Sequence, residues 1–110
     1  MDWQEVTTAI RQGESSKLKF FGTLKSHEDI GSVMVAMANS QGGRVIIGID
    51  IKNVHLYGSD IDTKWIESFQ IQHLSSPLTI TPYFINKAGK VIVILDVAQG
   101  KNKPYYFDNM

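Results

Sequence analysis

The chain has 110 residues, which is enough for one domain and too few for two. Its 11 Lys and Arg residues balance 11 Asp and Glu residues, so any phosphate contact must come from a local cluster of charge. Cysteine is absent, which excludes disulfides and thiolate metal sites, and no apolar run approaches the roughly 20 residues that span a bilayer. We therefore expect a cytoplasmic domain that does not bind membranes.

The first predicted elements are a short helix and a short strand. Asp2 is a candidate N-cap for a helix over Trp3 to Gln12, and Gly13 stands where a C-terminal cap belongs. The partial alternation and the aromatic side chains of Lys17 to Phe21 predict a strand.

The next stretch changes from a helical to an extended period within a few residues. Apolar spacing predicts a helix over about His27 to Asn39, and the nearly continuous aliphatic run Arg44 to Asp50 is typical of a central strand. We interpret Asn39, Gly42 and Gly43 as a structural turn in which Asn39 hydrogen-bonds nearby backbone. A phosphate loop runs from strand to glycines to helix, the opposite order, so a turn is favoured over a phosphate cradle.

The second half of the chain is predicted to contain a helix and three further strands, two of which form the clearest hairpin. In chain order these are a return strand within Asn53 to Gly58, a helix capped by Asp60 or Asp62 and ending near Leu74, and strands over Leu78 to Ile85 and Lys90 to Val97. Together the elements predict an α+β fold in two layers, with two to three helices packed on a mixed, mainly antiparallel sheet.

The order of these motifs resembles the Schlafen AlbA-like domain family. The matching residues are Gly13-Glu14-Ser15, Ala38-Asn39 with Gly42-Gly43, Gly48-Ile49-Asp50, Tyr57-Gly58, the hairpin around Gly89, and Lys103-Pro104-Tyr105. The resemblance implies a nucleic-acid-associated N-terminal domain of bacterial transcriptional regulators or RecG-related ATP-dependent helicases. Residues 1–110 would then be one domain of a longer protein. They contain no Walker motif, so any ATP-dependent activity of that protein would lie in its further domains.

The resemblance also bears on catalysis. Nucleolytic members of the family hold a metal with two glutamates and a later aspartate; by position Glu14 and Asp50 match two of these, and Lys19 stands in the third place. A lysine removes a hard oxygen ligand and adds a cation beside the metal. We therefore treat Glu14, Lys19 and Asp50 as a degenerate catalytic set and expect no metal or other cofactor. The alternative is that Glu14 caps or pairs locally and Asp50 ends its strand at a turn.

Basic residues supply the candidate phosphate contacts. Lys17 and Lys19 are predicted to share one strand face with Phe21, and lysine beside an aromatic ring can hold a backbone and stack a base. The alternative is solvated lysines on an edge strand. The predicted nucleic-acid-binding set is Lys17, Lys19, Lys25 and Arg44, and a second basic group is Lys87, Lys90, Lys101 and Lys103.

Three interpretations of function follow. The leading one is a non-catalytic nucleic-acid-binding domain that prefers DNA to RNA. The second is a protein–protein or oligomerisation module, including a homodimer, in which Tyr105-Tyr106-Phe107 forms a final strand or an edge that pairs with a partner. The third is a residual metal-dependent nuclease.

Overall fold

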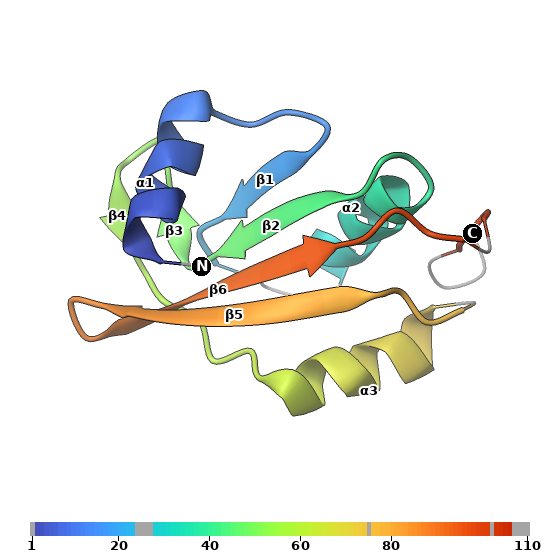
Figure 1. Ribbon diagram of the computed structural model, residues 1–110. Coiled ribbons are helices and arrows are strands. Elements are labelled where there is room, and N and C mark those ends of the chain that lie inside the picture. Colours follow the sequence, from blue (N-terminus) through green and yellow to red (C-terminus); the bar gives the residue numbers. More distant parts are fainter. Residues whose placement is uncertain (1, 24–27, 75, 102, 107–110) are drawn as a thin grey trace.

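The computed structural model describes residues 2–23, 28–74, 76–101 and 103–106, with only the backbone of residues 28 and 29. The described elements, drawn in Figure 1, are α1 (Trp3–Gln12), β1 (Leu18–Phe21), α2 (Glu28–Ala38), β2 (Gly43–Ile47), β3 (Ile49–Asp50), β4 (His55–Leu56), α3 (Thr63–His73), β5 (Ile80–Lys87) and β6 (Lys90–Val97). None of the described helices is long and apolar enough to cross a membrane.

The main sheet has the strand order β1-β2-β6-β5. Strands β1 and β2 are parallel, whereas β2 with β6 and β6 with β5 are antiparallel. The predicted α+β class and the mixed, mainly antiparallel sheet are therefore confirmed. Strands β2 and β6 lie at the centre, which explains their nearly continuous aliphatic sequences.

Apolar clusters cover both faces of this sheet. On one face, Val45 and Leu95 belong to a core shared with α2 and α3. On the opposite face, Ile46 and Ile94 pack with Val6 of α1. Helix α1 therefore adds a third, partial layer to the sheet and to the layer formed by α2 and α3 (Figure 1).

Two helices begin at the caps that the sequence predicts. The carboxylate of Asp2 accepts a hydrogen bond from the N–H of Glu5 at 3.0 Å, and Asp62, rather than Asp60, accepts one from the N–H of Trp65 at 2.8 Å. Gly13 ends α1 with φ 76°, in the left-handed region. Capping of this kind satisfies backbone donors that have no partner within the helix.

The expected single strand over Arg44 to Asp50 is wrong at Gly48. Strand β2 ends at Ile47, and Gly48 turns the chain with φ 106° into β3, which pairs with β4 in a separate two-stranded sheet. The N–H of Gly48 donates to the carbonyl of Phe21 at 2.7 Å, and its own carbonyl accepts from Tyr57 at 2.8 Å. A Cβ at position 48 would lie 3.0 Å from the backbone of Gly58, so the sequence needs glycine there.

The predicted hairpin is present as β5 and β6. Its turn residues Ala88 and Gly89 have φ of 54° and 75°, and positive φ at both central positions matches the right-handed twist of the strands. Strand β5 is an edge strand with Pro82 in its interior. Because proline has no N–H, it interrupts the pairing pattern that a further strand would need.

Candidate nucleic-acid interface

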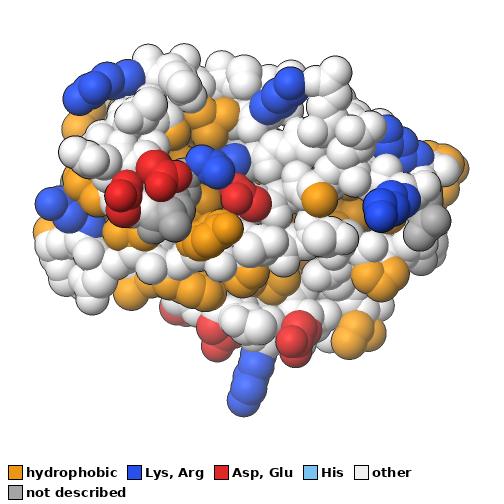
Figure 2. All heavy atoms as spheres, in the orientation of Figure 1, with side chains coloured by type: hydrophobic (Ala, Val, Ile, Leu, Met, Phe, Trp, Pro, Cys, Tyr) orange, Lys and Arg blue, Asp and Glu red, His pale blue; other side chains and the backbone are white. Residues whose placement is uncertain are grey.

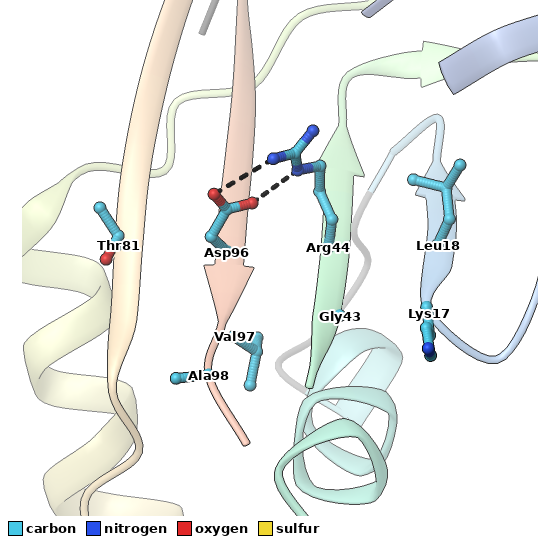
Figure 3. A pocket seen from close by; sticks show the side chains of 8 residues that line it. All are labelled: Lys17, Leu18, Gly43, Arg44, Thr81, Asp96, Val97 and Ala98. Atoms are coloured by element: carbon cyan, nitrogen blue, oxygen red, sulfur yellow. Dashed lines mark hydrogen bonds and ion pairs between the residues drawn. The ribbon is translucent and has the colours of Figure 1, made fainter. Parts of the chain in front are cut away.

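A hollow of about 400 Å³ opens at the end of the sheet where β2 begins (Figure 3). The cross-strand register explains its position, because Arg44 on β2 is paired with Leu18 on one side and with Asp96 on the other. Helix α1 covers the adjacent row, which contains Ile46 and Ile94, and leaves this last row partly open to solvent. The hollow is lined by Lys17, Leu18, Gly43, Arg44, Thr81, Asp96, Val97 and Ala98.

An ion pair occupies the middle of the hollow. The Nε of Arg44 donates to Oδ1 of Asp96 at 2.6 Å, and its Nη2 donates to Oδ2 at 3.3 Å. In Figure 3 the guanidinium of Arg44 turns toward Asp96 on the neighbouring strand β6. Two parallel N–H···O bonds are the strong, oriented form of this interaction. The charge of Arg44 is therefore already compensated within the protein.

The structure brings Lys17 to the same hollow. Lys17 immediately precedes β1, its side chain is exposed, and its carbonyl accepts the N–H of Arg44 at 2.8 Å. Lys19 is paired in register with Val45, so it lies on the opposite face of the sheet from Arg44. Lys19 and Arg44 of the predicted set are thus on opposite faces, and Lys25 lies outside the described residues.

The turn between α2 and β2 borders this end of the sheet. The sequence predicted that the Asn39 side chain would bond nearby backbone. Instead, both ends of its amide pair with the backbone of Tyr105, 66 residues away. Gly42 bends the chain with φ 81°. The Nζ of Lys103 donates to the carbonyl of Ser40 at 3.2 Å, which places a second lysine beside this turn.

Lys103 was outside the predicted binding set, although it belongs to the second basic group. No local pattern separates Lys103 from the other lysines of that group, because its contact is with Ser40, 63 positions away in the sequence. In Figure 2, cationic side chains on this face lie over the segment between α1 and β1 and over the C-terminal segment beside α2. They are separated rather than merged into one patch.

The two carboxylates of the degenerate set have local roles. Oε2 of Glu14 accepts the N–H of Phe20 in β1 at 3.0 Å. The carboxylate of Asp50 accepts from the backbone of Lys52 at 2.9 Å and from both the backbone and the side chain of Asn53 at 3.2 and 2.9 Å. The hydrogen bond from the Asn53 side chain is the main reason that the pKa of Asp50 is lowered.

Metal-ligand geometry is not found around these carboxylates. Over the described ranges, the structure contains no group of three or more His, Cys, Asp or Glu residues that could hold a metal ion. Glu14 instead bonds the backbone of Phe20 within β1, and Asp50 ends β3 and bonds the turn that follows it. Lys19 is a residue of β1. The hydrogen bonds agree with the alternative reading of local capping for Glu14 and a turn for Asp50.

The aromatic C-terminal segment does not form a strand within the described residues. Tyr105 is only 5% exposed and belongs to the core between the sheet, α2 and α3. Tyr106 is exposed, and Phe107 lies outside the described residues. The segment therefore packs on its own domain at Tyr105.

A family model decides how this fold is classified. The model of the Schlafen AlbA_2 family matches residues 8–110, nearly the whole chain. The chain belongs to the Schlafen AlbA_2 family. The resemblance of the sequence motifs to this family is thereby confirmed. No curated protein matches the chain.

Two solved structures share the Schlafen AlbA_2 fold seen here. The N-terminal domain of a protein from Nitrosomonas europaea, named as related to the ATP-dependent DNA helicase RecG, is 17% identical with a TM-score of 0.64. The match covers 97% of this chain and 80% of that one. The DIP2311 protein from Corynebacterium diphtheriae is 14% identical with a TM-score of 0.61, over 96% of this chain. This chain spans only 23% of the length of that structure.

Proposed function

We propose that this Schlafen AlbA_2 domain binds nucleic acid without cleaving it, with DNA preferred to RNA, as one module of a larger DNA-acting or transcription-regulating protein. The observation that carries the proposal is the hollow at the start of β2, with the exposed Lys17 on its rim and Lys103 at the adjoining turn. The family and the name of the Nitrosomonas protein support the same class of ligand.

The charge of the domain predicts how it binds. Because the net charge is zero, attraction to nucleic acid arises from a few local cations and not from the field of the whole molecule. Each phosphate neutralised by Lys or Arg releases counterions and contributes about 0.9 to the slope of log affinity against log salt for duplex DNA. We expect a shallow slope that corresponds to a few contacts.

A fluorescence-anisotropy titration tests the proposal. Labelled duplex DNA, single-stranded DNA and RNA are titrated with the domain at about 50 and about 200 mM salt. Lys17→Gln and Lys103→Gln should each weaken duplex binding and flatten the salt slope by about one unit. Lys64→Gln is the matched control, because Lys64 is exposed on α3, over the opposite face of the sheet.

Two outcomes would contradict the proposal. One is the absence of binding to all three nucleic acids at the lower salt concentration. The other is equal loss of affinity in Lys17→Gln and Lys64→Gln, which would remove the hollow as the contact surface. Absence of binding together with concentration-dependent light scattering would favour the protein–protein interpretation instead.

A further inference from the structure

The hollow contains a cation that is already engaged. We propose that Asp96 competes internally with phosphate for Arg44, so that this carboxylate sets the affinity of the hollow for a nucleic-acid backbone. The inference rests on the proposed function, because it concerns the same surface. It makes Asp96 an affinity-determining residue rather than a contact to the ligand.

The backbone holds the two partners together. Arg44 and Asp96 are directly paired residues of the adjacent antiparallel strands β2 and β6, so their side chains leave the sheet on the same face. Cross-strand pairs of opposite charge at this spacing need little ordering to meet. The carboxylate of Asp96 is therefore always close to the guanidinium of Arg44. Its effective concentration there is higher than the concentration of a free phosphate in solution.

The pair is nevertheless accessible. The side chain of Arg44 is 36% exposed and that of Asp96 is 32% exposed, so a phosphate can approach without unfolding the strand ends. A guanidinium fork binds carboxylate and phosphate with the same two-point geometry, which makes the two anions direct competitors.

The neighbours of the pair suit an exchange of partners. Lys17 lines the hollow on the β1 side, and its exposed side chain adds a second positive charge to the surroundings of the pair. Thr81 on β5 is paired in register with Asp96 on β6. Its hydroxyl can donate a hydrogen bond to the carboxylate once Arg44 has turned away. The cross-strand row Leu18, Arg44, Asp96 and Thr81, with Lys17 beside it, thus contains partners for both states.

A double-mutant cycle tests the inference. In Asp96→Asn the fork of Arg44 becomes available, which adds one phosphate contact. Affinity for duplex DNA should rise about tenfold at about 50 mM salt and about threefold at about 200 mM salt, with a slope steeper by about 0.9. Asp96→Ala, which leaves no oxygen for Arg44, should bind at least as tightly as Asp96→Asn.

The remaining variants separate the release of Arg44 from a general loss of negative charge. Glu5→Gln removes one exposed carboxylate on α1, over the same face of the sheet, and should tighten binding less than Asp96→Asn. In an Arg44→Gln background, Asp96→Asn should tighten binding no more than Glu5→Gln does. This coupling is what the cycle measures. Far-UV circular dichroism and thermal melting confirm that each variant is folded.

The possible results distinguish this inference from the function beneath it. The competition mechanism would be overturned if Asp96→Asn tightened binding equally with Arg44 and with Gln at position 44. It would also be overturned if the wild type bound DNA and neither Asp96→Asn nor Asp96→Ala changed the affinity. In both cases the domain would still be a nucleic-acid-binding module. Absence of binding in the wild type and in both Asp96 variants would overturn the function and the inference together.

Discussion

The side-chain amide of Asn39 pairs with the backbone of Tyr105 as one peptide group pairs with another. Its Nδ2 donates to the carbonyl of Tyr105 at 3.0 Å, and its Oδ1 accepts the N–H of Tyr105 at 2.6 Å. Nearby, the N–H of Gly100 donates to the carbonyl of Ala38 at 2.8 Å. The segment after β6 is therefore fastened to the end of α2 by side-chain and backbone hydrogen bonds.

We expect Asn39→Ala to lower the free energy of unfolding by about 1–3 kcal/mol, because it removes the partner of both backbone polar groups of Tyr105. Urea denaturation followed by tryptophan fluorescence measures the change. Ser40→Ala is the control, since the hydroxyl of Ser40 is on an exposed residue and only its carbonyl binds Lys103. Equal stability of the two variants would show that the Asn39 bonds contribute nothing.

Two glycines with similar positive φ, Gly13 at 76° and Gly42 at 81°, should differ in their tolerance of alanine. A Cβ at Gly42 would lie 2.7 Å from the carbonyl oxygen of Val97 and 2.9 Å from the N of Gln99, whereas nothing lies within 4 Å of a Cβ at Gly13. Gly13→Ala should cost about 1–2 kcal/mol, from the positive φ alone. Gly42→Ala adds a clash with backbone and should cost about 3 kcal/mol or more. Thermal and urea unfolding compare the two, and a smaller loss in Gly42→Ala would contradict the packing described.

Asp50 should titrate below its usual pKa of 3.8, because its carboxylate accepts hydrogen bonds from Asn53 and Lys52. A lowered pKa in the folded state means that ionised Asp50 stabilises the fold. This stabilisation is complete above the unfolded pKa and is lost as the pH falls through the lower folded value. Carboxyl carbon chemical shifts in an NMR titration measure the midpoint. Asn53→Ala should raise it toward 3.8, and an unmoved midpoint would contradict the assigned cause.

Lys19→Glu restores the acidic residue of the family pattern without building a metal site. We expect no saturable Mn²⁺ binding, because Asp50 is engaged by three N–H donors and Glu14 by the N–H of Phe20. Selective, saturable broadening of the Glu14 and Asp50 NMR signals by Mn²⁺ would overturn this expectation.

The same variant tests whether Lys19 contributes to phosphate binding. Lys19→Glu should bind duplex DNA more weakly than Lys19→Gln, because it adds a repelling charge as well as removing an attractive one. Anisotropy at two salt concentrations measures both variants. Affinity that is unchanged or raised in Lys19→Glu would remove Lys19 from the contact surface.

The parts of the fold that could be predicted from the sequence are those determined by neighbouring residues. Asp2 and Asp62 each cap a helix by accepting the N–H of the residue three positions further on. Gly89 is in the turn between two strands that are adjacent in the sequence. Local hydrogen bonds and positive φ leave signals in the chain itself. Gly48 was missed because it stands within an aliphatic run, and its role depends on contact with Gly58, ten positions further on.

The candidate site depended on register, which the sequence does not fix. Whether Lys19 and Arg44 share a face is decided by the parallel pairing of β1 with β2, and a shift of one residue would reverse it. The ion pair joins residues 52 positions apart. A signal was nevertheless present: Arg44 and Asp96 each adjoin a run of aliphatic residues in a strand, and charges in such positions are seldom left without a partner.

The small β3–β4 ribbon offers a place to modify the molecule without disturbing its core. It is joined to the main sheet through the backbone of Gly48, and its turn ends in Val54, which is 84% exposed with φ 49°. Exposed turns of this kind accept insertions and chemical groups more readily than the sheet that supports them. Because the chain has no cysteine, Val54→Cys would introduce a single thiol. A fluorophore attached to that thiol would report on ligands from outside the hollow.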